Sequence, residues 1–376
     1  MKRFLAILFW GVILSVVGAF AYNFSWLDDP HREGPAQLIA HRGIHQTFDL
    51  EGVANDTCTA TRIHAPTHNY IENTIPSMQA AFEAGAAIVE LDVHLTPDGE
   101  FAVFHDWTLD CRTDGQGVTE DTPMPTLRTL DVGYGYTADN GATYPLRGKG
   151  LGMMPTLGEV FAANPDKKFL VNFKSNRADE GQALVDLIAA HPEWRGQLWG
   201  VYGGDAPTNT TLNAVPDLTG YTRNSLMTCA RDYMLLGWTG VVPDACRNTT
   251  VAVPANYAWM VWGWPHKFTR RMEAANTNVI LLGAMENGDI GSSGIDSVTD
   301  LKQVPEGFGG YVWTNRIELL GPALAAGQQP EPAPPPAPPE PVEIEEPAAE
   351  LASASAEDAE TEDQPEGYYI GDPDGC

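Results

Sequence analysis

Short apolar runs and amphipathic stretches alternate through the middle of the chain, between residues 38 and 316. The runs are rich in β-branched and aromatic residues and predict strands, whereas the stretches between them are long enough for helices. Strands that alternate with helices are typical of a parallel sheet joined by crossover helices. The predicted strands cover residues 38–40, 88–95, 101–105, 169–174, 198–202, 219–222, 279–282 and 310–314, and residues 258–262 are a ninth candidate.

Eight or nine such strands predict an α/β fold, a TIM-type (β/α)8 barrel. A doubly wound open sheet is the competing architecture, but no Gly-x-Gly-x-x-Gly follows the first predicted strand. Two long insertions, 44–71 and 107–154, follow predicted strand ends, and loops of this length usually carry function or are disordered. Asn73 and Thr74 can cap a helix over 75–84, and Gly85 suits its left-handed end. A second helix is predicted to start at Thr156.

The two ends of the chain have patterns of their own. Lys2 and Arg3 precede an apolar run over 4–20, which predicts either a signal peptide within residues 1–21 or a membrane anchor. Residues 327–376 are rich in Pro and Glu, and we expect a disordered acidic tail, because this composition buries too little apolar area to fold. A single folded domain is therefore expected over 36–325.

Net charge and cysteine content narrow the class of protein. The formal charge is −28, and the tail holds 14 acidic residues and no basic residue, so a nucleic-acid partner is excluded by the lack of clustered Lys and Arg. No pattern points to a protein partner. Five cysteines and the N-terminal run indicate export, to the periplasm, the cell envelope or the medium, with possible membrane association through residues 4–20.

Four of the cysteines lie inside the predicted domain, and the fifth is Cys376. Of the three pairings that four cysteines allow, we favour Cys229 with Cys246 as a local clip, and Cys58 with Cys111 as a tie between two loops near the active site. Independent buried thiols are the alternative. No Cys-x-x-Cys pair indicates a zinc or redox site.

Polar residues alternate strictly with apolar ones in the predicted strand 88–95, so Glu90, Asp92 and His94 share one face. Carboxylates two residues apart on a strand are near enough to converge on one cation, and oxygen ligands favour Mg²⁺ or Ca²⁺. Ordinary polar alternation on an exposed strand face is the competing interpretation.

Two histidines follow the neighbouring predicted strands, His41 after 38–40 and His105 at the end of 101–105. In a barrel of parallel strands the carboxyl ends form the active face, where a histidine pair can supply a general base and a general acid. Arg42 offers a planar fork for phosphate oxygens, and Lys174, at the end of 169–174, offers a second positive charge.

These motifs and their order resemble the glycerophosphodiester phosphodiesterase family: His41-Arg42-Gly43, Glu72-Asn73-Thr74, Glu90-Leu91-Asp92-Val93, Thr96-Pro97-Asp98-Gly99 and His105-Asp106. The resemblance is dense over 38–109, apart from the first insertion, and resumes at 155–157. It implies that one divalent cation is held by Glu90 and Asp92, while His41 and His105 form the acid/base pair.

Further roles follow from the same resemblance. Arg42 would bind the phosphate, Glu72 would lie close to the metal as a ligand or a support, and Asn73 would border the site. Asp106 is expected to have a supporting role. The family commonly has a carboxylate two residues before the strand lysine, where this chain has Asn172, an uncharged candidate for the third metal ligand.

The function implied is metal-dependent hydrolysis of a glycerophosphodiester to an alcohol and sn-glycerol 3-phosphate, with the substrate's own glycerol hydroxyl as a candidate nucleophile. Two alternatives stay open, a lipid phosphodiesterase such as a lysophospholipase D or a sphingomyelinase D-like enzyme, and a non-catalytic envelope binding protein on the same scaffold. No Gly-x-Ser-x-Gly elbow indicates a serine hydrolase. Aromatic residues at later strand ends, among them Trp199, Tyr202 and Trp313, are candidates for an apolar pocket or for the core.

Overall fold

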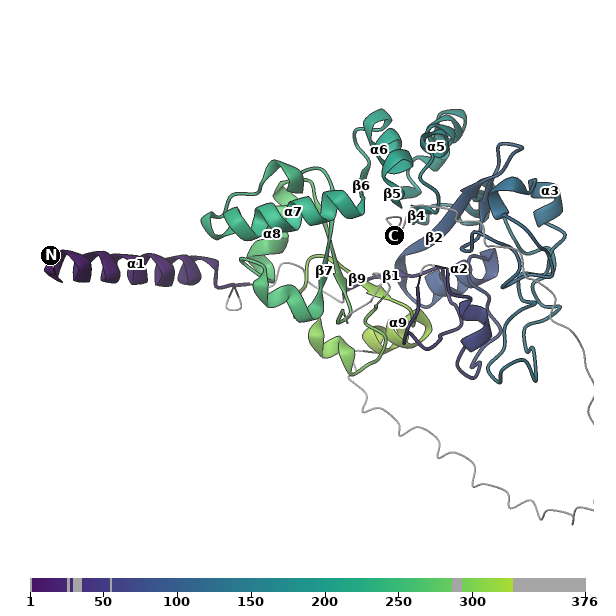
Figure 1. The fold of residues 1–376 in the computed structure, drawn as a ribbon, viewed down its shortest axis with the longest axis horizontal. Helices are drawn as coiled ribbons and strands as arrows, with labels where there is room; N and C mark the ends of the chain where they lie inside the picture. Colours follow the sequence, from purple (N-terminus) through teal and green to yellow (C-terminus); the bar gives the residue numbers. More distant parts are fainter. Residues whose placement is uncertain (1, 26–27, 30–35, 55, 286–292, 327–376) are drawn as a thin grey trace, which may run out of the picture.

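A computed structural model describes residues 2–25, 28–29, 36–54, 56–285 and 293–326 (Figure 1). Its centre is a nearly closed barrel of parallel strands in the order β6-β5-β4-β2-β1-β9-β8-β7, which confirms the predicted TIM-type fold. The predicted acidic tail over 327–376 lies outside the described residues. The barrel strands are β1 Gln37–Ala40, β2 Ala86–Leu95, β4 Phe169–Phe173, β5 Leu198–Gly203, β6 Thr219–Tyr221, β7 Thr250–Pro254, β8 Asn278–Leu282 and β9 Tyr311–Thr314.

The barrel closes between β6 and β7 by side-chain hydrogen bonds, because no backbone ladder joins these two strands among the described residues. The Thr249 hydroxyl donates to the carbonyl of Gly220 at 2.8 Å. Asn278, the first residue of the next strand β8, also reaches β6, where its amide donates to the Thr219 hydroxyl at 2.8 Å. Two side chains thus bridge the gap that a strand ladder fills elsewhere in the barrel.

Helices cover the outside of the barrel, and both predicted helix starts are confirmed. The Thr74 hydroxyl caps α2 by accepting from the Ser77 amide, and Gly85 ends that helix with φ +106°. Thr156 and Glu159 form a reciprocal capping box at the start of α4. The helices of the barrel are α2 Ile75–Glu83, α4 Leu157–Ala163, α5 Ala178–Ala190, α6 Asp205–Ala214, α7 Arg223–Leu236, α8 His266–Ala274 and α9 Ile317–Ala325.

One strand prediction is wrong, and another is right for the strand but wrong for its place in the barrel. The run 101–105 forms β3 Phe101–Val103, which pairs antiparallel with β2 and lies off the barrel path, because the short Thr96–Gly99 turn leaves no room for a crossover helix. The run 258–262 overlaps the short 3₁₀ helix Ala255–Met260, in which only Ala258 is buried. The strand missing from the sequence-based set is β7, whose short Thr-Val-Ala-Val run directly precedes that helix.

The two insertions fold together beside the barrel, on the right in Figure 1, around the short helix α3 Met124–Leu127. The disulfide Cys58–Cys111 joins one insertion to the other, as predicted, and Cys229–Cys246 is also formed. Apolar residues of both insertions share a core of their own with the β2–β3 hairpin, made by Ala60, Ile63, Ile71, Ala102, Phe104, Leu109, Met124, Leu127, Val132, Tyr136, Leu146 and Met154.

The helix α1 Lys2–Asn23 projects away from the barrel, on the left in Figure 1. Among the described residues, one helix, Arg3–Asn23, has the length and apolar character to cross a membrane. It coincides with the run that predicted a signal peptide or an anchor, and both interpretations agree with its composition.

Candidate active site

The strand β2 sorts its side chains between two surroundings. Ile88 belongs to the apolar layer inside the barrel, together with Ile39, Leu170, Ile280 and Trp313. Its neighbours Val89, Leu91 and Val93 face the other way, into the large core between the barrel and its helices. Because side chains alternate along a strand, Glu90 and Asp92 point to the inside with Ile88. Both carboxylates are fully buried, which confirms the predicted parity.

Asp92 is surrounded by hydrogen-bond donors and positive charges. The Asn73 amide donates to Oδ2 at 2.9 Å and accepts from the Asp92 backbone N–H at 3.2 Å, so the orientation of Asn73 is fixed. Arg42 Nε lies 3.1 Å from Oδ2, and Lys174 Nζ lies 3.7 Å from Oδ1. Burial would raise the pKa of Asp92, but the charges of Arg42 and Lys174 outweigh burial and hold that pKa well below its usual range.

Glu90 has a different environment although it is only two residues away. The Tyr202 hydroxyl donates to its Oε1 at 2.7 Å, and the Arg42 backbone N–H donates to its Oε2 at 3.1 Å. Burial and the nearby Asp92 raise the pKa of Glu90 to about 8. The pKa values of the two neighbouring carboxylates are therefore shifted in opposite directions.

His41 follows β1, and its ring is oriented by β9. Nδ1 lies 2.6 Å from Oδ1 of Asn315, whose amide group donates to Asp296 at 2.8 Å. This second bond shows that oxygen faces His41, so Nδ1 carries the proton. Nε2 has no hydrogen-bond partner in the described part of the chain and lies 3.9 Å from Glu90 Oε2. Burial, then the charge of Arg42, lowers the pKa of His41.

His105 reaches the site from the β2–β3 hairpin rather than from the end of a parallel strand. Its Nδ1 lies 2.6 Å from Oδ1 of Asp106, which can only accept, so Nδ1 is protonated here too. Burial, followed by the charges of Arg42 and Lys174, lowers the pKa of His105. The structure thus brings the two predicted histidines to one site, each with Nε2 left for a ligand.

Arg42 holds a backbone conformation that supports this arrangement. Its φ is +57°, and Gly43 follows with φ +77°. A Cβ on Gly43 would lie 2.6 Å from the Ser77 hydroxyl oxygen and 3.0 Å from the Met78 backbone nitrogen. Only glycine fits there without a shift of α2, and a left-handed non-glycine residue such as Arg42 is a mark of functional sites.

Arg112 is the residue that sequence reasoning missed, and it connects the two ends of the site. Its Nε donates to Asp106 Oδ2 at 2.9 Å, and its NH1 donates to Glu72 Oε2 at 2.9 Å. Glu72 also accepts from Arg42 at 3.1 Å. A line of charges therefore runs from His105 through Asp106, Arg112 and Glu72 to Arg42.

The disulfide lies next to this line. Arg112 follows Cys111, and its NH2 donates to the hydroxyl of Thr59, which follows Cys58, at 2.7 Å. One feature of the sequence could have pointed to Arg112, because the preceding residue, Cys111, was expected near the active site. Asn315, directly after β9, was also missed, although its strand-end position could have revealed it. Tyr202, on β5, was named as a strand-end aromatic residue but not as a hydrogen-bond partner of Glu90.

The oxygen atoms of Glu90, Asp92 and Asn172 are the candidate ligands for a cation. Asn172 Oδ1 is buried without a hydrogen-bond partner, beside an amide nitrogen that donates to Asp92 at 2.9 Å. An orphaned oxygen next to two carboxylates suits a hard divalent ion. Within the described residues, however, no three His, Cys, Asp or Glu side chains come together to hold a metal. Glu72 is occupied by two arginines, and its role as a ligand stays a prediction.

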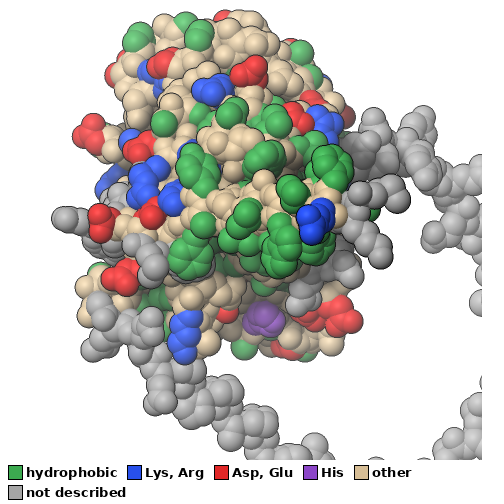
Figure 2. All heavy atoms as spheres, turned by 90° about the vertical axis from the view of Figure 1, so that its left-hand side faces the viewer, with side chains coloured by type: hydrophobic (Ala, Val, Ile, Leu, Met, Phe, Trp, Pro, Cys, Tyr) green, Lys and Arg blue, Asp and Glu red, His purple; other side chains and the backbone are tan. Residues whose placement is uncertain are grey.

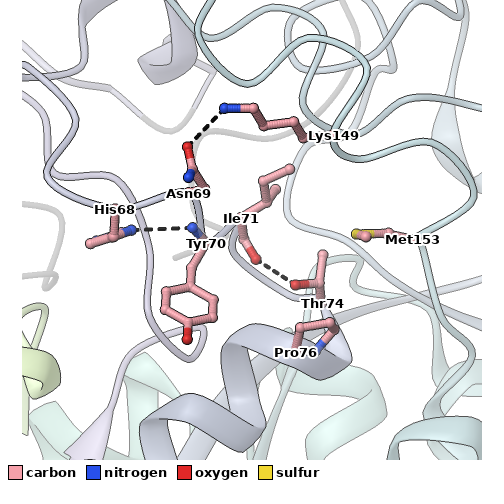
Figure 3. A pocket seen from close by; sticks show the side chains of 8 residues that line it. All are labelled: His68, Asn69, Tyr70, Ile71, Thr74, Pro76, Lys149 and Met153. Carbon is pink, nitrogen blue, oxygen red and sulfur yellow. Dashed lines mark hydrogen bonds between the residues drawn. The ribbon is translucent and has the colours of Figure 1, made fainter.

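Two open pockets border the insertions, and neither is lined by His41, His105, Glu90 or Asp92. The larger, of about 480 Å³, lies between the first insertion, the start of α2 and the second insertion (Figure 3). The smaller, of about 140 Å³, is lined by His45 and Arg316, among others. His45 donates from Nδ1 to the carbonyl of His41 at 2.9 Å, so this second pocket adjoins the site.

Comparisons with known proteins identify a family that the chain resembles. Residues 64–193 match the model of the glycerophosphoryl diester phosphodiesterase family. A glycerophosphodiester phosphodiesterase from Caldanaerobacter subterraneus is 39% identical over 106 residues, 28% of this chain and 40% of the relative. Human glycerophosphodiester phosphodiesterase 1 is 36% identical over 140 residues, 37% of this chain and 40% of the relative. The chain thus spans about two fifths of the length of these two relatives.

Solved structures share the fold at low sequence identity. The glycerophosphoryl diester phosphodiesterase domain of an uncharacterized Mycobacterium tuberculosis protein has TM-score 0.54 and 15% identity, covering 79% of this chain and 100% of that chain. A glycerophosphoryl diester phosphodiesterase from Parabacteroides distasonis has TM-score 0.50 and 15% identity, covering 81% of this chain and 90% of that chain. The family-model match over residues 64–193, the curated relatives and the shared barrel fold all support the glycerophosphoryl diester phosphodiesterase family for this chain.

Proposed function

We propose that this protein hydrolyses glycerophosphodiesters to an alcohol and sn-glycerol 3-phosphate. The observation that carries the proposal is the histidine pair. Each ring donates a hydrogen bond from Nδ1 to an acceptor on this chain, which leaves Nε2 available for a ligand. The curated relatives, named as glycerophosphodiester phosphodiesterases, support the substrate class.

The partners of the two rings support different roles. The carboxylate of Asp106 favours a positively charged ring, so His105 is the better general acid for the leaving alkoxide. Asn315 offers a neutral oxygen, which suits His41 as the base that takes the proton of the attacking hydroxyl or water. Burial, followed by the charges of Arg42 and Lys174, depresses the pKa of His105. A bound phosphodiester would offset both charges and raise that pKa toward a useful range.

Arg42 and Lys174 are the proposed phosphate ligands. Both are buried and paired with Asp92, at 3.1 Å and 3.7 Å. Lys174 also lies 4.9 Å from the centre of the Trp107 ring, which limits its freedom. Burial lowers the pKa of Lys174, and Asp92 opposes that shift. The site therefore presents two positive charges in an otherwise acidic protein, as a phosphodiester requires.

A divalent cation, Mg²⁺ or Ca²⁺, would be held by Glu90, Asp92 and the amide oxygen of Asn172. When bound, it would polarise the phosphate and offset the charge that develops on it. The support is the buried, unpartnered Oδ1 of Asn172 beside the two carboxylates. Without a third carboxylate the site should bind its cation more weakly than an all-carboxylate site.

We also propose that the barrel is exported. Two disulfides in a chain with an N-terminal apolar helix support an oxidising compartment, such as the periplasm, the cell envelope or the medium.

The test is an assay of purified, metal-loaded protein with glycerophosphocholine and either Mg²⁺ or Ca²⁺. Release of choline together with glycerol 3-phosphate is expected. Lysophosphatidylcholine in a parallel reaction distinguishes the lipid phosphodiesterase alternative, which would release choline from the lysolipid in preference. Absence of turnover with every glycerophosphodiester tried would contradict the proposed function and favour a binding protein.

A further inference from the structure

The end of α1 is fixed to the barrel by several contacts. The Asn23 amide donates to the Trp238 carbonyl at 2.8 Å, and Asn23 Oδ1 accepts from Arg271 at 2.9 Å. Lys267 donates to the carbonyls of Tyr22 and Phe24, the orphaned acceptors at the end of the helix. The helix therefore leaves the domain at a fixed place and without a slack linker.

Large hydrophobic side chains are exposed around this place. One group lies at the end of α7 and in the turn after it, where Trp238 contacts Asn23. The other lies in the 3₁₀ helix Ala255–Met260, just before Trp262, whose ring is 5.3 Å from that of Phe20. We call the two groups the collar; its members are Met234, Leu235, Leu236, Trp238, Val241, Tyr257, Trp259 and Met260.

The collar and α1 share one side of the molecule. Figure 2 looks at the side from which α1 projects, and the hydrophobic side chains gathered in its middle include those of α1 itself. Trp259 is 80% exposed and Leu235 is 65% exposed, which is unusual for such side chains on a protein surrounded by water. Trp and Tyr at the end of an apolar helix are typical of the boundary between membrane and water.

Charge does not explain the collar. Arg231 is paired with Asp232 at 2.9 Å, and Arg270 with Asp28 at 2.7 Å. Two further cations, Lys267 and Arg271, are engaged by oxygens at the end of α1, so little charge on this surface is left to attract a charged partner. The collar is suited to an apolar environment instead.

We propose that the collar is a membrane-docking surface, which enters the interface of a lipid bilayer while α1 remains in the chain and crosses that bilayer. The 22 residues of α1 extend over about 33 Å, which matches a hydrocarbon core of about 30 Å. A second protein that covered the collar would have to leave room for this helix at its centre. A bilayer accommodates both.

The proposal is independent of the catalytic site, so its test uses no activity measurement. The full chain with Cys376→Ser carries one new cysteine, Trp259→Cys in the collar or, as the control, Thr126→Cys on α3, at the other end of the molecule (Figure 1). The remaining four cysteines are in disulfides. Each protein is labelled with a polarity-sensitive fluorophore and reconstituted into phosphatidylcholine vesicles with nitroxide on the acyl chains.

The label at 259 should shift to the blue and lose several-fold more emission to the nitroxide lipid than the label at 126. This difference should persist in about 1 M salt, where charges are screened beyond about 3 Å. Equal quenching at both positions overturns the proposal. So does a blue shift at 259 without lipid quenching, since that outcome means a protein partner such as a second copy. Intact mass must show that α1 is retained; a chain that begins at or after Tyr22 overturns the proposal as well.

Discussion

The two halves of the site hold equivalent rings by different means. His41 is oriented within the barrel itself, by Asn315 after β9 and Asp296 behind it. His105 is oriented outside the barrel frame, by Asp106, which directly precedes the second insertion, and by Arg112 within that insertion, which a disulfide ties to the first. In the first half the partner of Nδ1 is a neutral amide at the end of a regular strand. The second uses charge and irregular chain.

This difference suggests a division of labour. A neutral partner keeps the ring of His41 uncharged and ready to accept a proton. A carboxylate partner stabilises the charged ring of His105, and Arg112 prevents Asp106 from turning away. The activity of the His41 half should be sensitive to a change of the ring's tautomer. The His105 half should depend on Arg112 and on the disulfide Cys58–Cys111.

Removal of either ring should have the largest effect. His41→Ala and His105→Ala should each lower kcat/KM for glycerophosphocholine by about 10²–10⁴-fold. With a p-nitrophenyl ester of glycerol 3-phosphate, whose leaving group needs no proton, His105→Ala should recover at least about tenfold of that loss. His41→Ala should recover none. Steady-state kinetics with both esters checks this, and an equal response of the two variants would contradict the assigned roles.

The carboxylate of Asp106 should matter through its charge. Asp106→Asn keeps an oxygen acceptor for Nδ1 and should lower kcat about 10–100-fold. Because the pKa of His105 falls without the carboxylate, the acid loses its proton earlier, and the alkaline limb of the pH–rate profile should shift to lower pH.

Asn315→Ala is the matched change on the other half. It removes an acceptor without changing charge, so a loss of about tenfold is expected with the alkaline limb in place. A pH–rate profile for each variant decides the matter. Identical shifts in both would show that charge does not distinguish the two halves.

The two disulfides provide a third comparison. Cys58–Cys111 closes a loop of sequence separation 53, and Cys229–Cys246 closes one of 17. From the entropy of loop closure, the first should stabilise the fold by about 4 kcal/mol and the second by about 3 kcal/mol. Only Cys58–Cys111 lies beside Arg112. At temperatures where it is still folded, the Cys58→Ser, Cys111→Ser variant should have a kcat about tenfold lower, because the proposed general acid His105 would be less well positioned. The Cys229→Ser, Cys246→Ser variant should keep its rate; thermal melts and kinetics on both variants test this, and equal rate losses would argue against the tether.

The smallest effect on catalysis is expected from His45, which contacts only the His41 half. Burial lowers the pKa of His45 to about 4, below its unfolded value near 6.5. The unfolded chain therefore binds the proton first, and stability present above pH 6.5 is lost as the pH falls toward 4, by up to about 3 kcal/mol. His45→Asn keeps a donor for the His41 carbonyl and should flatten this slope. Denaturant melts between pH 4 and 7 provide the measurement, and an unchanged slope would refute it.

The sequence was sufficient for the parts of the molecule that depend on local pattern. Strand parity placed Glu90 and Asp92 together, and capping residues fixed the starts of α2 and α4. It failed where two apolar runs competed for one place in the barrel. The run at 258–262 is more apolar than β7, but its surface faces outward beside α1, which a pattern of hydrophobicity alone does not reveal.

Arg112 and Asn315 show a different limit. Each acts through a partner far away in the chain, Glu72 at a separation of 40 residues and His41 at 274. No spacing rule links such residues, because their proximity depends on how insertions and strand ends meet in space. The predicted disulfide was the nearest substitute, since it placed position 111 beside the site.

The side-chain closure between β6 and β7 has a consequence for motion. Two threonines and an asparagine do the work of a backbone ladder there, and such bonds are individually weaker determinants of order than a continuous row of peptide pairs. Amide protons of β6 and β7 should therefore exchange with solvent sooner than those of β2 and β4, by opening of the seam alone. We therefore expect the barrel to open locally between β6 and β7, the strands that flank α7, while the strands that carry the catalytic residues stay paired on the far side.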